Sequence, residues 1–126
     1  MAVAYVDTSC LVAIAFAERG ATSIERRLRE FDELVSANLL EAEIRSAFRR
    51  ERVEFTAETI AALSWLIPDR SITDEITRVL DAGYVRGADC WHLASALFLE
   101  PEPASMTFLT LDDTQRKVAK ALGFRV

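Results

Sequence analysis

The sequence predicts an α/β protein in which helices cover both faces of a central parallel sheet. Short runs of apolar, strand-forming residues alternate along the chain with longer segments of helical periodicity. Strands that alternate with helices pair in parallel through right-handed crossovers, and such crossovers place helices on both faces of the sheet. The fold class follows from this alternation.

The N-terminal third predicts two strands and two helices. An apolar run at 2–6 ends at polar residues that commonly cap a helix, so it is expected to be a buried strand. A nearly all-apolar helix is expected at 9–18, with Gly20 as its stop. A charged amphipathic helix at 22–31 and a brief strand at 34–36 follow.

The middle of the chain is predicted to form three more helices and a short strand. Helices are expected at 39–52, at 56–66, where Pro68 interrupts, and at 74–82. The strand expected between the last two covers 70–72.

The C-terminal part repeats the alternation. A nearly all-apolar helix is expected at 88–99, a strand at 107–111 and a helix at 113–122 that Gly123 closes. Residues 124–126 are expected to add a final edge strand.

The length and composition predict one domain that spans 1–126. A chain of 126 residues with 51% hydrophobic residues can bury a core without disulfides or structural metals. No apolar run approaches the ~18 residues that a bilayer span needs. The N-terminus lacks the basic region of a signal peptide, and Cys10 and Cys90 have no zinc-ligand spacing, so we expect a cytoplasmic protein.

The charge balance argues against a protein that holds nucleic acid mainly through a basic surface. The net charge is −5 and the sequence pI is about 4.9. The arginine-rich run at 49–52 is more typical of a solvated helix face than of an RNA track. A nuclease whose bound metal supplies the positive charge stays compatible with this composition.

Two aspartates follow predicted strands. Asp7 ends the first strand and Asp112 follows the strand at 107–111. Ligands of an open parallel sheet gather beyond the carboxyl ends of its strands, so both acids are candidate site residues. An aspartate between a strand and a helix is equally often a simple N-cap.

Asp89 is a third candidate, in the first turn of the apolar helix. Helical spacing aligns it with Leu93 and Leu97, so its carboxylate faces packed surface. Such a group is costly to bury unless it is hydrogen-bonded, paired or bound to a cation, although capping is the alternative.

A fourth acid comes from the helix at 39–52. Glu41 lies four residues before Arg45 and suits a solvated ion pair, whereas Glu43 borders the apolar stripe. Glu43 is favoured, and Glu41 stays open. Carboxylates that converge at one edge of a sheet would suit a hard cation, Mg²⁺ or Mn²⁺.

Four motifs occur in order along the chain, at 5–11, 39–45, 86–96 and 108–113. Together they resemble the PIN-domain family, specifically the VapC-like toxins of toxin–antitoxin pairs. The resemblance implies a three-layer α/β/α sandwich, often homodimeric, that cleaves RNA with Mg²⁺ or Mn²⁺ and a water nucleophile. It implies a cognate antitoxin that blocks the site. The implied metal and catalytic residues are Asp7, Asp89, Asp112 and Glu43.

Neighbouring polar residues have open roles. Thr8, Ser9 and Thr110 could hold a water or a phosphate oxygen beside the metal, or could only cap helices. Asp113 could assist or replace Asp112. His92, three residues after Asp89, is expected to pack and hydrogen-bond rather than to act as a general base.

Two other functions compete with the ribonuclease. A catalytically idle PIN-like module that acts through protein binding should have lost its acids, and here all four are present. A phosphatase of the aspartyl-phosphate type usually has Asp-x-Asp after the first strand, whereas position 9 is Ser here.

Overall fold

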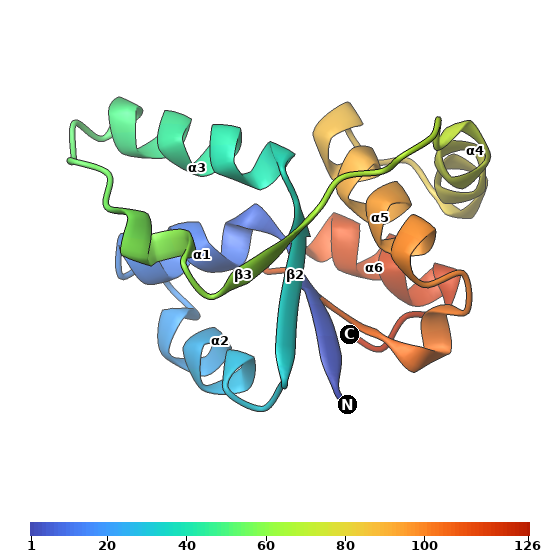
Figure 1. Cartoon of the computed structure of the whole chain (residues 1–126), viewed down its shortest axis with the longest axis horizontal. Helices are drawn as coiled ribbons and strands as arrows, with labels where there is room; N and C mark the ends of the chain where they lie inside the picture. The colour runs from blue at the N-terminus through green and yellow to red at the C-terminus, as the bar shows by residue number, and fades with distance from the viewer.

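The computed structural model describes all residues from 1 to 126 (Figure 1). In chain order the elements are β1 (Val3–Val6), α1 (Thr8–Ala15), α2 (Ala21–Leu28), β2 (Glu33–Ala37), α3 (Leu39–Arg50), the 3-10 helix η1 (Ala57–Ile60), β3 (Leu63–Leu66), α4 (Thr73–Ala82), α5 (Gly87–Leu99), the 3-10 helix η2 (Pro103–Ser105), β4 (Thr107–Leu109) and α6 (Asp113–Leu122).

The four strands form one parallel sheet in the order β3-β2-β1-β4. On β1, Tyr5 pairs with Val35 of β2 on one side and with Phe108 of β4 on the other. The N–H of Asp7 donates to the carbonyl oxygen of Leu109 at 2.9 Å, so the ladder continues to the end of the strand. The carboxyl ends of the strands therefore share one edge, where ligands of parallel sheets bind.

Helices cover both faces of the sheet and make a three-layer α/β/α sandwich, which confirms the expected fold class. Alternate side chains of a strand point to opposite faces. Ala4 and Val6 belong to a core cluster with α1, α2 and α3, whereas Tyr5 belongs to a larger cluster with α4, α5 and α6. Figure 1 shows these two sets of helices on either side of the strands.

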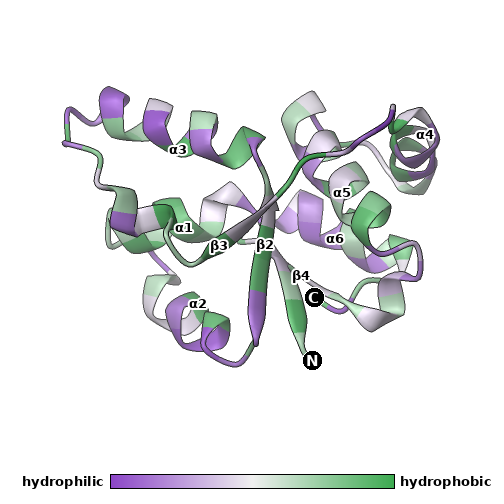
Figure 2. Cartoon of the chain, viewed as in Figure 1, coloured by the Kyte–Doolittle hydropathy of each residue, from purple (hydrophilic) through white to green (hydrophobic).

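The helix α3 illustrates how the sequence produces one buried face. Leu40, Ile44, Ala47 and Phe48 are buried, as the 3.6-residue period predicts, while the intervening residues are at least partly exposed. Figure 2 shows this as an alternation of purple, hydrophilic segments with green ones along α3. The buried face anchors the helix, and the residues beside it are then oriented toward the edge of the sheet.

The helix expected at 56–66 is wrong. The chain forms one 3-10 turn, η1, and then the edge strand β3, which pairs with β2 over four residues. Pro68 disfavours helical backbone at the preceding residue, so a helix in this segment would have to end before Ile67. Pairing to the exposed edge of β2 outweighs the weak helical pattern of this segment.

Of two further predicted strands, one is absent and the other is shortened to a single bridge. Residues 70–72 form no strand; Ile72 is instead buried in the core, directly before α4. At the C-terminus only Arg125 bridges the sheet, where it pairs with Thr107 through hydrogen bonds to Phe108 and Met106. The left-handed backbone of Gly123, with φ 106°, ends α6 as expected.

Two further expectations concern thiols and membranes. Cys10 and Cys90 are free and buried, as expected of small apolar side chains. None of the helices has the length and apolar character that crossing a bilayer requires.

Gly83 ends α4 where that helix approaches α6, and there is no room for a side chain at this position. A Cβ at this position would lie 2.9 Å from Cγ2 of Val118, a stiff β-branched side chain. We expect Gly83→Ala to lower the free energy of unfolding by about 1–3 kcal/mol in urea denaturation, because the core is overpacked. In a Val118→Ala background the added cost of Gly83→Ala should nearly disappear.

Gly87→Ala is the matched control. A Cβ at Gly87 would contact nothing within 4 Å. It should leave the stability unchanged or raise it by up to about 1 kcal/mol. A similar loss in both variants would mean that the contact with Val118 is not the cause.

Candidate functional site

Asp7 is buried at the carboxyl end of β1 and is held by neutral donors from three segments. One carboxylate oxygen accepts from the N–H of Ser9 at 3.1 Å and from the hydroxyl of Thr110 at 3.3 Å. The other accepts from the side-chain amide of Gln115 at 3.2 Å. Asp7 therefore caps α1, as one of the two expectations stated, and it is also fixed in place at the edge of the sheet.

Glu43 reaches the same edge from α3. Its Oε1 accepts from the hydroxyl of Thr8 at 2.8 Å and from Nε2 of His92 at 2.6 Å. Burial alone would raise the pKa of Glu43, but these hydrogen bonds outweigh it and hold the pKa below its ordinary value. Glu43 is thus a partly exposed, ionised carboxylate with a fixed orientation.

Glu41, the alternative to Glu43, lies elsewhere. Its carboxylate pairs with Arg45 at 2.9 Å on the exposed side of α3. The two glutamates are two residues apart, which is about 200° around a helix, so only one of them can face the sheet edge. The structure places Glu43 there.

His92 is completely buried between Tyr5 and Glu43. Burial raises the pKa of Tyr5, so its hydroxyl stays protonated. That hydroxyl accepts from the N–H of Ala37 at 3.0 Å, and its own proton is donated to Nδ1 of His92 at 2.6 Å. Nε2 of His92 must then carry the proton that it donates to Glu43. His92 packs and hydrogen-bonds, as its sequence position predicted.

Asp89 lies in the first turn of α5, half-buried, and makes no side-chain hydrogen bond. Burial raises its pKa, and the negative charges of Asp7 and Asp112 raise it further, with a smaller effect of Glu43. The four predicted acids therefore form one electrostatic cluster, although they are far apart in the sequence.

Asp112 and Asp113 have different environments. Asp112 caps α6, where its Oδ1 accepts from the N–H of Gln115 at 2.7 Å, and its side chain is exposed at the sheet edge. Asp113 is exposed and forms an ion pair with Arg116, one turn further along α6. Of the two, only Asp112 contributes to the raised pKa of Asp89.

Thr8, Ser9 and Thr110 lie among the acids, and each hydroxyl is engaged with the protein. Thr8 bonds to Glu43, and Ser9 accepts from the N–H of Leu111 at 3.0 Å. The single hydroxyl proton of Thr110 is shared between Gln115 at 2.7 Å and, more weakly, Asp7 at 3.3 Å. They orient the acids and the loop after β4. No hydroxyl of the three is free of protein contacts.

Two residues of the site were missed by sequence reasoning, Tyr5 and Gln115. Gln115 is completely buried and contacts both Asp7 and Thr110. A polar residue three positions after a capping aspartate is a weak signal that could have identified it. Tyr5 lies in an apolar run, where a tyrosine is most simply assigned to the core.

The four acids offer only oxygen donors to a cation. As the side chains stand, no three of the histidines, cysteines and acids are arranged closely enough to hold a metal ion. The available donors are carboxylate oxygens, which suit Mg²⁺ or Mn²⁺ better than softer metals. Burial raises the pKa of Asp89 most, and the negative charges of Asp7 and Asp112 raise it further. A divalent cation would relieve that repulsion, so the chemistry of the cluster fits such an ion.

Fold and site together define an α/β protein with a carboxylate cluster at the carboxyl edge of a parallel sheet. The profile of the PIN domain matches residues 4–121, which is nearly the whole chain. The chain therefore belongs to the PIN-domain family. PIN domains are generally nucleases, that is, hydrolases of phosphodiester bonds. A comparison with curated protein sequences found no match.

The Tyr5 hydroxyl connects three elements, and its removal should be costly. We expect Tyr5→Phe to lower the free energy of unfolding by about 1–3 kcal/mol in urea denaturation, because Ala37 N–H and His92 Nδ1 lose their partner in the core. Tyr84→Phe, at a tyrosine that is 80% exposed, should change it by less than about 0.5 kcal/mol. Equal effects of the two variants would contradict the network.

The raised pKa of Asp89 predicts a pH-dependent stability without metal. A carboxyl whose folded pKa is raised disfavours folding once the pH exceeds that pKa, and the penalty is absent below its ordinary value. In EDTA, Asp89→Asn should therefore melt at a higher temperature than the parent at neutral pH, and the difference should vanish in acid.

Asp113→Asn is the control for this measurement, since Asp113 is exposed and paired with Arg116. It should show no gain at neutral pH. A stabilisation of Asp89→Asn that persists unchanged in acid would show that charge repulsion is not its source.

Proposed function

We propose that the protein is a metal-dependent endoribonuclease whose reaction centre is the cluster of Asp7, Glu43, Asp89 and Asp112. The observation that carries this proposal is the placement of the acids at one edge of the sheet: Asp7 ends β1, Asp112 follows β4, and Glu43 reaches Thr8 from α3. Asp89 lies near them, since burial and then the charges of Asp7 and Asp112 raise its pKa. The membership of the PIN-domain family supports hydrolysis of phosphodiester bonds. The resemblance to VapC-like toxins supports RNA as the substrate.

Asp7 and Asp89 would hold the cation, Mg²⁺ or Mn²⁺, with Asp112 and Glu43 as direct or water-bridged ligands. When bound, such an ion makes a water more acidic and neutralises charge on the phosphate. Asp7 and Glu43 are preorganised for this task by their fixed hydrogen bonds. Asp89 and Asp112 lie on the more exposed side, where an ion and a phosphate would enter.

Water is the proposed nucleophile because the nearby side chains are otherwise engaged. The hydroxyl of Thr8 donates to Glu43 and that of Thr110 to Gln115. His92 is completely buried, and both ring nitrogens are used by Tyr5 and Glu43. His92 therefore orients Glu43 and is not placed to take a proton from a water in the open part of the site.

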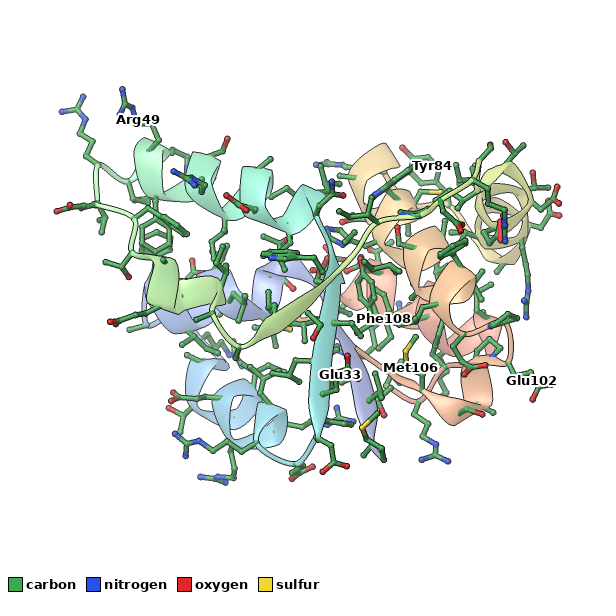
Figure 3. The ribbon with its side chains drawn as sticks, in the orientation of Figure 1. Glu33, Arg49, Tyr84, Glu102, Met106 and Phe108 are labelled. Atoms are coloured by element: carbon green, nitrogen blue, oxygen red, sulfur yellow. The ribbon has the colours of Figure 1, made fainter.

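We further propose that the protein is the toxin of a toxin–antitoxin pair, that a cognate antitoxin blocks the site, and that the chain forms a homodimer. An apolar cleft of about 450 Å³ supports a protein contact near α4 and α5. Its lining includes the exposed Leu80 and Tyr84 and the partly buried Trp91. Figure 3 shows Tyr84 beside these two helices.

The proposal predicts RNA cleavage that depends on the acids. Purified protein should cut RNA in Mg²⁺ or Mn²⁺, and Asp7→Asn and Asp89→Asn should each lower the rate by about 100-fold or more, because a lost metal ligand removes stabilisation of several kcal/mol. Glu41→Gln, on the exposed side of α3, should cut like the parent.

Equal cleavage by the parent and the two aspartate variants would point to a contaminating nuclease. A folded parent protein that cuts no RNA with either metal would favour the idle, protein-binding module instead.

Metal binding is expected to stabilise the folded chain. Mn²⁺ at about 100 times its dissociation constant adds about 2.7 kcal/mol, which corresponds to a rise in Tm of several degrees. Asp89→Asn should remove most of this rise in a thermal-shift experiment, whereas Asp113→Asn should retain it. An unchanged response of Asp89→Asn would place the ion at another site.

A further inference from the structure

A small pocket of about 200 Å³ lies beside β4, on the side of that strand that faces away from β1. It is lined by Phe108 and the three residues that follow it, and no residue of β1 lines it. On this side the strand pairs only with Arg125, and Figure 2 shows the C-terminus next to β4. Asp7 hydrogen-bonds to the other side of β4, through the carbonyl oxygen of Leu109, so the pocket and the carboxylate cluster lie on opposite sides of this strand.

A main-chain donor at this pocket has no partner. The N–H of Phe108 donates to the carbonyl oxygen of Arg125 at 2.8 Å. N–H groups two residues apart point to the same side of a strand, so the N–H of Thr110 faces the pocket as well. It makes no hydrogen bond, although Thr110 is buried. A buried N–H is rarely left without a partner, so an acceptor, either a water or a ligand, is expected there.

Two arginines line the pocket, and no acidic residue does. The charge of Arg116 is largely compensated, because it pairs with Asp113 and donates to the carbonyl oxygen of Thr110 at 2.8 Å. Arg27 forms no ion pair, and only one of its nitrogens has a partner, the carbonyl oxygen of Val126 at 3.2 Å. A guanidinium carries five donors, so Arg27 keeps its positive charge and several free N–H groups at the pocket.

The rest of the lining is mainly apolar, and the pocket is small. Ile24 of α2 and Leu111, after β4, are among the apolar side chains that line it. A phosphate or an RNA backbone has no alkyl group to place against them. A dry cavity of about 150 Å³ holds benzene, so this pocket has room for about five or six carbon atoms. A nucleotide is too large, because drug-sized ligands occupy about 300–1,000 Å³.

We propose that this pocket binds a small aliphatic carboxylate. The carboxylate accepts from the guanidinium of Arg27 and from the N–H of Thr110, and the alkyl group packs against Ile24 and Leu111. A charge-assisted hydrogen bond of this kind is about twice as strong as a neutral one, which favours a carboxylate over a water at the same donors. The proposal does not rest on the ribonuclease function, because the carboxylate cluster takes no part in it.

The test is a titration of the isotope-labelled full chain with isovalerate, followed by the amide signals in NMR spectra. EDTA is present, so that no metal in the carboxylate cluster can bind the probe. We expect saturable shifts that are largest for the amides of Thr110 and Leu111. Isovaleramide has the same alkyl group without the charge, and inorganic phosphate has charge without the alkyl group. Each should bind about tenfold more weakly or worse, because one of the two contacts is lost.

Variants of α2 separate the pocket from general effects. Arg27→Gln should weaken isovalerate binding about tenfold or more, because the charged partner is lost, and Arg27→Lys should retain part of the affinity. Ser23 is exposed and lines the pocket, so Ser23→Leu should block binding without removing a contact of the core. Arg26→Gln, at the neighbouring exposed arginine, is the matched control and should bind like the parent.

Three results would overturn the proposal. The first is a parent whose Thr110 amide does not shift at high millimolar isovalerate. The second is binding of isovaleramide or of phosphate as tight as that of isovalerate, since the pocket would then recognise only one half of the ligand. The third is isovalerate binding that persists in folded Arg27→Gln and Ser23→Leu. None of these measurements involves RNA cleavage, so the ribonuclease function is tested separately.

Discussion

The buried carboxylate of Asp7 is the constraint on which the rest of the structure depends. A charged group at the end of a central strand requires compensation, and here only neutral donors supply it. Those donors come from the start of α1, from the residue after β4 and from α6. The sheet edge and the two helices are therefore fixed relative to one another by a single side chain.

The same edge is supported by a second network of buried hydrogen bonds. Tyr5 and His92 connect β1, the end of β2, and α5 to the carboxylate of Glu43 through buried hydrogen bonds. Every polar group in this series of hydrogen bonds has a partner. A fully hydrogen-bonded polar network in the core favours one arrangement of the fold over its alternatives. The acids are thereby held close together although their charges repel.

Much of this arrangement could be predicted from the sequence, because its signals are local. Asp7 and Asp112 follow strands, Asp89 opens an apolar helix, and Glu43 borders an apolar stripe, so each position is apparent from its neighbours. The choice between Glu43 and Glu41 needed the rotation of α3, which the structure supplies. The role of Gln115 could not be predicted from local pattern, because it depends on contact with Asp7, 108 positions away.

The errors in the predicted secondary structure also come from contacts between distant segments. Residues 63–66 become a strand because β2 offers an edge to pair with, and no pattern within the segment encodes that partner. At 124–126, one bridge replaces the expected strand because only Arg125 aligns with Thr107. Interactions between distant segments decide these cases, whereas the long amphipathic helices are determined by their own periodicity.

The position of the Tyr5 hydroxyl also determines how the site can exchange molecules with solvent. Breaking its contacts would disturb β1, an interior strand of the sheet, together with the end of β2 and α5, so the floor of the site can open only when much of the domain unfolds. Molecules that enter or leave the site must then pass the exposed side, where Asp112 lies. The site is therefore a rigid surface that opens on one side only, and its access does not require the fold to open.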